Sequence, residues 1–171
     1  RFLPVQVVAH LKPKIKTFFL PYRDYVRNGR ITYEVEKIED FLKKRHKNII
    51  TLPLKDGESI SQATESILKK IDGVLITEYS LHTDDITEIT ALAKRHGIPV
   101  FGSTEDTLRQ GALFGTKADL EFMGVKAAEY CHEILSSEKK PADLPIHMLE
   151  DSRRIIVNPQ ALAEHGVTFS E

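Results

Sequence analysis

The amino-acid sequence predicts an α/β fold, a parallel sheet with helices on both faces. Short apolar runs that do not alternate with polar residues are typical of strands buried on both faces. Segments with apolar residues at intervals of three and four separate these runs and are typical of helices. The repeated order of strand and helix then requires parallel strands joined by right-handed crossovers.

Strands and helices alternate as far as Phe101. The predicted strands are rich in β-branched and aromatic residues and cover residues 14–20, 48–54, 74–77 and 98–101. The helices between them are expected at residues 31–46, 59–71 and 84–96. Pro21 is expected to stop the first strand, and either Thr83 or Asp84 to cap the third helix. A further short helix is expected ahead of the first strand, at residues 5–11.

The pattern changes in the last third of the chain. It predicts a long helix, two short strands and a last helix at residues 118–136, 146–149, 154–157 and 159–165. Cys131 lies on the apolar face of the long helix and is expected to be a small buried hydrophobe. Asn158 as N-cap, Pro159 as first helical residue and Gly166 as stop define the last helix.

Length and composition narrow the class of protein. The chain has 171 residues, which fits one domain or one lobe of a larger protein. Its 24 Lys and Arg against 25 Asp and Glu give a net charge of −1, which argues against a nucleic-acid partner. The single cysteine excludes an internal disulfide and a cysteine-based metal site. The sequence starts at Arg1 rather than Met, so we expect a fragment of a longer chain.

The sequence lacks the motifs of cofactor and nucleophile chemistry. It contains no glycine-rich dinucleotide fingerprint, no phosphate-binding loop and no nucleophile elbow. Its seven histidines are scattered without a pair at metal-ligand spacing. We therefore expect no cofactor, no metal and no enzymatic activity. The least favoured alternative is a flavodoxin-like enzyme that uses Glu78, His82 or Glu105 as an acid or base.

Polar residues follow the carboxyl ends of the predicted strands. In an open parallel sheet, ligands bind beyond these ends, and hydroxyl groups and tyrosines there suit a small polar ligand. The same loops face water and cap helices, so their polarity also has a purely structural explanation. The candidate ligand-binding residues are Tyr22, Arg23, Thr77, Glu78, Tyr79, Ser80, Ser103, Thr104, Glu105 and Gln110.

Several motifs resemble one known family. They are Gly97–Glu105, Gln110–Leu113, Asp119–Gly124, Lys140–Pro145 and Val157-Asn158, and the most specific are Arg109–Leu113 and Lys140–Pro145. Together they resemble the C-terminal half of ABC-type substrate-binding proteins, whose known members bind aromatic amino acids such as tryptophan. The preceding order of strands and helices also fits this family.

The resemblance implies a Rossmann-like lobe of a type I periplasmic-binding fold, in which two lobes close on a small ligand. It divides the chain into a ligand-binding lobe at 13–110, a crossing strand and long helix at 111–140 that would pack on a missing N-terminal lobe, and a return segment at 141–171. The implied partners are a small, amino-acid-like ligand, the missing lobe and a membrane permease, with no nucleic acid. The implied location is periplasmic or extracytoplasmic, with a membrane-anchored lipoprotein as one form.

The chain departs from the family at both ligand-binding loops, which map onto Glu78-Tyr79-Ser80 and Ser103-Thr104-Glu105. Tyr79 stands where the family often has Asp, and Thr104 replaces a second Asp. An amino-acid ligand needs an anion to meet its ammonium group, and Glu78 or Glu105 is expected to supply it. The identity of the ligand stays open.

Two further expectations follow from the resemblance. The same lobe as the extracytoplasmic sensor of a signalling receptor is the leading alternative function. In a lone lobe, the apolar face from Leu120 to Leu135 is expected to pack on the helix at 5–11 or to be exchanged in a homodimer. Burying half of that face is worth several kcal/mol, at about 25 cal/mol per Å².

Overall fold

The computed structural model describes residues 15–23, 30–78, 80–137, 139–146 and 153–166. The helix expected at residues 5–11 lies outside this part of the chain, as does Tyr79. Contacts divide the chain into two compact units, and residues 117–154 belong to the smaller one. The larger unit contains the sheet and the candidate site.

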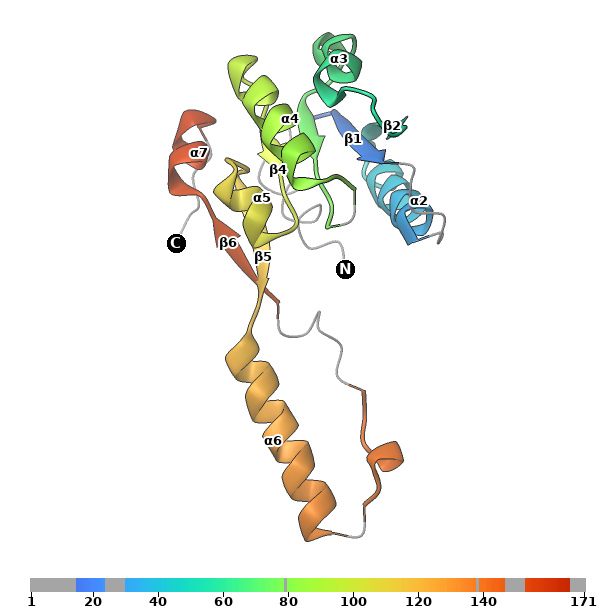
Figure 1. Cartoon of the computed structure of the whole chain (residues 1–171), viewed down its shortest axis with the longest axis vertical. Helices are drawn as coiled ribbons and strands as arrows, with labels where there is room; N and C mark the ends of the chain where they lie inside the picture. Colours follow the sequence, from blue (N-terminus) through green and yellow to red (C-terminus); the bar gives the residue numbers. More distant parts are fainter. Residues whose placement is uncertain (1–14, 24–29, 79, 138, 147–152, 167–171) are drawn as a thin grey trace. The chain divides into compact units, whose positions relative to one another are not determined.

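Four parallel strands form the main sheet, in the order β2-β1-β3-β4. They are β1 (Thr17–Arg23), β2 (Asn48–Leu54), β3 (Gly73–Leu75) and β4 (Val100–Phe101). The helices of this unit are α2 (Arg30–Lys43), α3 (Ile60–Glu65), the 3-10 helix η1 (Leu68–Lys70), α4 (Thr83–Arg95), α5 (Glu105–Arg109) and α7 (Pro159–Glu164). The predicted strand at 48–54 is confirmed at both ends, and the predicted parallel α/β architecture is confirmed (Figure 1).

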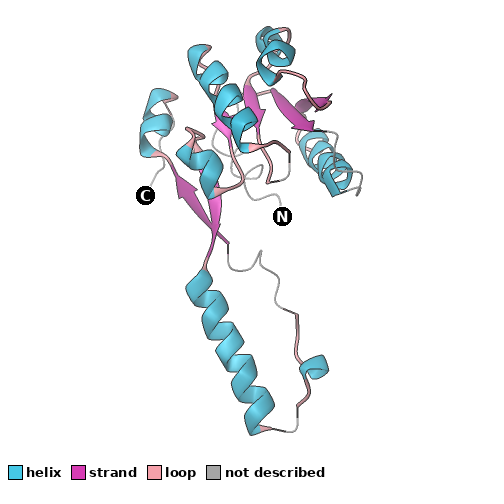
Figure 2. Cartoon of the chain, viewed as in Figure 1, coloured by secondary structure: helices cyan, strands magenta, loops and turns pink. Residues whose placement is uncertain are grey.

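Side chains alternate between the two faces of β1 and build a core on each face. Phe18 and Leu20 belong to one cluster, which α2 and α7 complete with residues such as Ile38. Phe19 points to the opposite face, where Ile60 of α3 and residues of α4 surround it. Helices therefore lie on both sides of the strands (Figure 2). Replacing a phenylalanine as buried as Phe19 by alanine costs about 3–5 kcal/mol.

Strand β1 does not stop at Pro21, as the sequence predicted, but continues to Arg23. Alternate residues of a strand direct their backbone N–H and C=O groups to the same neighbouring strand. The carbonyl of Thr17 and the amide of Arg23 both bond on the β3 side, so an N–H at position 21 would also point to that side. The β1–β3 register ends at Phe19, so no ladder bond is lost there. A proline is tolerated where a strand needs no donor.

Two helix boundaries also differ from the sequence prediction. The helix expected at 59–71 breaks after Glu65, where the Ser66 hydroxyl donates to the carbonyl of Ala63 (3.1 Å). Such local hydroxyl bonds compete with continuation of a helix. The N-cap of α4 is His82 rather than Thr83 or Asp84, and its backbone N–H donates to Asp85 Oδ2 (3.3 Å).

A second, two-stranded sheet consists of β5 (Phe114–Ala118) and β6 (Arg153–Val157). The strand expected at 154–157 is confirmed, whereas most of its expected partner at 146–149 lies outside the described residues. The last helix is also confirmed. Asn158 accepts from the amide of Ala161 (3.1 Å), Pro159 opens α7, and Gly166 follows it with a φ of 59°.

The smaller unit contains the long helix α6 (Leu120–Ser136) and the 3-10 helix η2 (Pro141–Asp143). Tyr130 of α6 donates its hydroxyl to the carbonyl of Pro145 (2.7 Å). No residue of α6 is buried by the described chain, and Leu135 is 86% exposed. The expectation of a buried Cys131 is therefore wrong for this chain, because no described element covers that face. None of the described helices has the length and hydrophobicity needed to cross a bilayer.

Candidate functional site

The carboxyl ends of the parallel strands bring most of the candidate residues to one edge of the sheet. Tyr22 and Arg23 end β1. Thr77, Glu78 and Ser80 follow β3, and residues 103–105 follow β4. The amide of Arg23 donates to the carbonyl of Ser80 (2.8 Å), which ties the ends of β1 and β3 together. This edge is where ligands bind in open α/β sheets.

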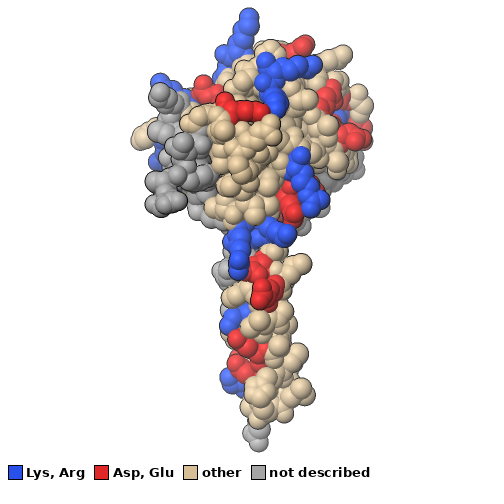
Figure 3. Space-filling model, turned by 90° about the vertical axis from the view of Figure 1, so that its left-hand side faces the viewer, with Lys and Arg blue, Asp and Glu red and all other residues tan. Residues whose placement is uncertain are grey.

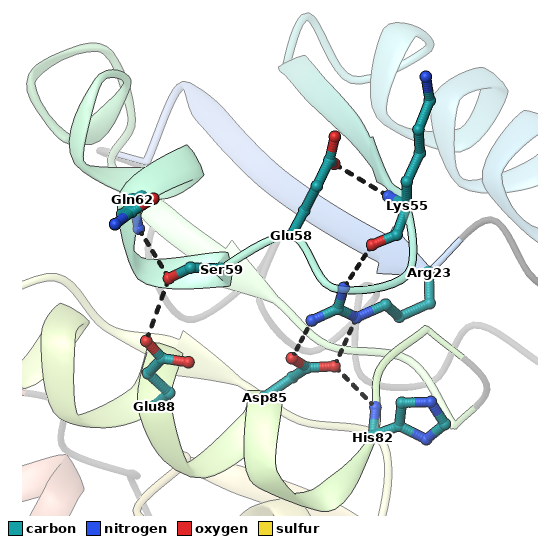
Figure 4. A network of polar contacts seen from close by, with 8 residues as sticks. All are labelled: Arg23, Lys55, Glu58, Ser59, Gln62, His82, Asp85 and Glu88. Carbon is teal, nitrogen blue, oxygen red and sulfur yellow. Dashed lines mark hydrogen bonds and ion pairs between the residues drawn. The ribbon is translucent and has the colours of Figure 1, made fainter.

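Arg23 is buried and its guanidinium is fully engaged with neighbouring elements (Figure 4). Its Nε and Nη2 donate to the two carboxylate oxygens of Asp85 (2.9 and 2.5 Å), and Nη1 donates to the carbonyl of Lys55 (2.7 Å). The hydrogen bond from Arg23 holds the pKa of Asp85 below its usual value, against the opposing effect of burial. The pair joins β1, the loop after β2 and the start of α4, which makes Arg23 a framework residue of this edge.

The loop after β3 is closed by Ser80. Its buried hydroxyl donates to the carbonyl of Thr77 and accepts from the amide of Thr77, both at 3.1 Å. The hydroxyl of Thr77 donates to Glu34 Oε2 of α2 (2.9 Å). Glu34 therefore lies at the same edge, although the sequence analysis missed it. The available signal was its place near the start of the helix that follows β1.

The loop after β4 turns directly into α5. Thr104 is the N-cap, and its hydroxyl accepts from the amide of Thr107 (3.2 Å), which confirms the capping alternative for this residue. Glu105 in the first turn forms an ion pair with Arg109 (2.9 Å). The hydroxyl oxygen of Ser103 is buried without a hydrogen-bond partner among the described residues. The loop thus offers Glu105 and a hydroxyl with unused bonding capacity.

Gln110 does not join this group. It follows α5 and lines a groove of about 410 Å³ between α4, the end of α5 and α7. Its side-chain oxygen accepts from the hydroxyl of Thr87 (2.8 Å). Helix α5 carries the chain away from the carboxyl edge, so a residue close to Ser103 in sequence lies elsewhere in the fold. Within the described ranges, no three His, Cys, Asp or Glu side chains gather as a metal site would require.

Comparison with known sequences identifies the family. Residues 4–171 match the model of the ABC transporter substrate binding protein family, and the chain therefore belongs to it. A curated relative, the tyrosine-binding protein of Clostridioides difficile strain R20291, is 27% identical over 158 residues. The match covers 92% of this chain and 45% of that protein. These findings confirm the resemblance predicted from the motifs.

Solved structures share the fold at low sequence identity. The ligand-free, open structure of CD0873, a substrate binding protein with adhesive properties from Clostridium difficile, has a TM-score of 0.82 and 22% identity, and the match covers 98% of this chain and 55% of that one. An ABC domain from Streptococcus pneumonia in complex with L-Trp has a TM-score of 0.71 and 18% identity, with 96% and 56% covered. The chain spans about half the length of these relatives. The matched family is one of substrate-binding proteins, and these comparisons do not support the signalling-receptor alternative.

Proposed function

We propose that this chain is one lobe of an extracytoplasmic ABC transporter substrate-binding protein, and that its carboxyl-edge loops form one wall of a cleft for an amino-acid-like solute. The observation that carries the proposal is that acidic residues follow the carboxyl ends of neighbouring strands. Glu34, Glu78 and Glu105 follow three neighbouring strands. Carboxylates are the groups that recognise an ammonium ion, through charge-assisted hydrogen bonds.

In this proposal most of the edge residues have a defined part. Glu34 and Glu105 receive the ammonium group, and Ser103 offers its hydroxyl to a polar group of the ligand. Arg23 positions the edge through Asp85 and does not contact the ligand. Thr77, Ser80 and Thr104 shape the loops, while Gln110 is outside the wall. The relatives named for tyrosine and tryptophan support an aromatic amino acid as the first ligand to test.

We further propose that residues 111–140 cross to a second lobe and that α6 packs there. The large exposed apolar side chains of α6, among them Leu120, Val125 and Leu135, support this role. Cys131 provides the test, because it is the single cysteine of the chain. In the protein with both lobes, a thiol reagent should modify it slowly until urea is added. Fast modification in the folded protein would contradict the packing, and protection that depends on protein concentration would indicate exchange in a homodimer.

Binding is tested by thermal shift and calorimetry on the protein that contains both lobes. L-Tyrosine or L-tryptophan at about 100 times its dissociation constant should stabilise the protein by about 2.7 kcal/mol. The analogue that lacks the amino group should bind much more weakly. Glu34→Gln and Glu105→Gln should each weaken amino-acid binding by about tenfold or more, since one charge-assisted bond is lost. Glu65→Gln, an exposed residue of α3, is the matched control. If the amino acid and its analogue without the amino group bind equally well, the proposed ammonium site is contradicted.

A further inference from the structure

The near-zero net charge of the chain conceals a separation of charge between the two edges of the sheet. Basic residues gather where the strands begin, and we name this set the basic edge: Lys16, Lys43, Lys44, Arg45, Lys47, Lys69, Lys70, Lys94 and Arg95. Each member precedes the amino end of one of the four parallel strands. Acidic residues prevail at the opposite edge, where Glu34, Glu78, Asp84, Glu105 and Asp106 lie.

Hydrogen bonds show that neighbouring parts of the basic edge adjoin one another. The amide of Asn48 donates to the carbonyl of Lys16 (2.7 Å), and Lys47 Nζ donates to the carbonyl of Ile15 (2.5 Å). Asp72, which follows Lys69 and Lys70, accepts from the amide of Lys16 (2.9 Å). The segments before β1, β2 and β3 therefore meet side by side. In Figure 3, blue Lys and Arg side chains project from the upper end of the larger unit, and red Asp and Glu side chains lie among them.

The basic edge is exposed to solvent. All its members except the half-buried Lys47 are exposed, and the side chains of Lys43 and Lys94 are 69% and 66% exposed. Acidic residues close to these basic positions are fewer. Glu39 pairs with Lys43 (3.6 Å) and Glu164 with Lys94 (3.2 Å), while Asp72 accepts from backbone amides. The other acidic residues close to these positions in sequence are Asp40 and Glu65.

Helix dipoles explain only part of this accumulation. A cation near a helix C-terminus contributes about 0.3–1 kcal/mol, and the effect falls off within the last turn. Residues 43–47, however, read Lys-Lys-Arg-His-Lys, and Lys16 precedes a strand rather than ending a helix. Like charges so close together repel one another. Helix capping therefore does not explain all of these basic residues.

We propose that the basic edge binds the anionic headgroups of a membrane surface. This inference rests on the proposed function only for the location, because a binding protein that serves a permease works beside a membrane. Strands lie about 4.8 Å apart, so four strand ends spread the charge over roughly 15 Å. Such a broad patch brings several lysines within one Debye length of a surface, about 8 Å at physiological salt.

The composition of the basic edge favours a membrane over a nucleic acid. Lysine, a point charge, dominates it, whereas base recognition relies on arginine forks and aromatic stacking. One aromatic ring lies beside Arg45, that of Phe41; it is partly buried against the core, and the guanidinium carbon of Arg45 lies 3.6 Å from its centre. Binding should therefore be electrostatic and sensitive to salt, without insertion into the bilayer.

Sedimentation with vesicles tests the proposal on the full-length protein. The protein should sediment with mixed phosphatidylcholine and phosphatidylglycerol vesicles but not with phosphatidylcholine alone, and added salt should release it. The triple variant Lys43→Gln/Lys44→Gln/Arg45→Gln should reduce the partition coefficient by at least tenfold, since each basic residue contributes about fivefold. The control Lys117→Gln/Lys139→Gln/Lys140→Gln removes equal charge from the smaller unit and should have little effect.

Four outcomes would overturn the proposal. The first is that the protein shows no preference for anionic vesicles at about 0.15 M salt, where the Debye length is about 8 Å. The second is that the control variant loses as much vesicle binding as the triple variant, and the third is that the protein binds a DNA duplex more tightly than vesicles. The fourth is that inorganic phosphate releases the protein from vesicles at constant ionic strength. The last would identify a free-phosphate site. Thermal shift with L-tyrosine and L-tryptophan separates this proposal from the proposed function. The triple variant should keep the thermal shift with these amino acids, whether or not it still binds vesicles. Loss of the thermal shift without loss of vesicle binding would count against the proposed function and not against the membrane proposal.

Discussion

Removal of Asp85 should destabilise the larger unit more than the loss of any exposed ion pair. Asp85 accepts from Arg23 Nε and Nη2 and from the amide of His82, and the two side chains of the ion pair are 10% and 9% exposed. Asp85→Ala leaves a buried guanidinium without its counter-ion, which costs about 3–5 kcal/mol. For a chain of this size, the melting temperature should fall by about 2–4 °C per kcal/mol.

The assay is thermal and urea unfolding of the wild type and three variants. Arg23→Met/Asp85→Leu removes both charges and should be less destabilised than Asp85→Ala, because no buried charge is left unpaired. Glu164→Ala breaks the exposed pair with Lys94 and should change stability far less than Asp85→Ala, because solvent screens exposed ion pairs. A cost below about 1 kcal/mol for Asp85→Ala, or a double variant as unstable as the single one, would refute the reasoning.

The pH dependence of the unfolding free energy tests the same ion pair, because its direction follows from the pKa of Asp85. The pKa of Asp85 is lower in the folded chain than in the unfolded one, so its contribution to stability is complete above the unfolded value, about 3.9. As the pH falls below that value, the contribution declines, and it is lost once the pH passes the folded pKa. The gap in unfolding free energy between wild type and Asp85→Asn should be constant from neutral pH to about 4 and then close. A gap that widens on acidification would contradict the assignment.

Three further changes probe the loops and the last helix. Gly102→Ala should destabilise the chain by about 1–3 kcal/mol, because its Cβ would lie 2.0 Å from Thr107 Oγ1; urea unfolding measures this, and an unchanged midpoint would contradict it. Gly115→Ala would place a Cβ 2.1 Å from the carbonyl of Thr104, so it should displace the 103–105 loop and weaken ligand binding in calorimetry, while unaltered affinity would argue against that loop as part of the wall. Asn158→Ala should cost about 1 kcal/mol through loss of the α7 cap, with Gln160→Ala on the same helix as the control.

Local patterns predicted the elements of this fold better than the contacts of its site. The apolar run at 48–54 matches β2 fully, because a buried strand needs such residues whatever it packs against. Glu34 could not be found this way, since helical spacing marks Val35 and Ile38 as buried but does not say that Glu34 reaches Thr77.

Residues that follow a strand were predicted as one group, and the structure separates them. The pairing of Arg23 with Asp85, 62 residues later, depends on how β1 and α4 pack, which no local pattern encodes. Gln110 was predicted to belong to the same group, but the five residues of helix α5 separate it from the loop after β4, and it lies in the groove beside α4. The proximity of a residue to a strand end is therefore informative only until the next helix begins.

The hydroxyl of Ser103 distinguishes a ligand-binding role from a structural one. It is buried without a partner among the described residues, so the folded chain gains no hydrogen bond from it. Ser103→Ala should therefore leave the free energy of unfolding within about 0.5 kcal/mol of wild type or raise it, because an unsatisfied polar group is removed. If the hydroxyl bonds to a ligand when the cleft closes, the same variant should weaken binding by about tenfold. For Thr104→Ala we expect the opposite effect on stability. Thr104 caps α5, and loss of this cap should cost about 1 kcal/mol of stability. A Ser103→Ala protein that is destabilised and binds normally would assign this residue to the framework instead.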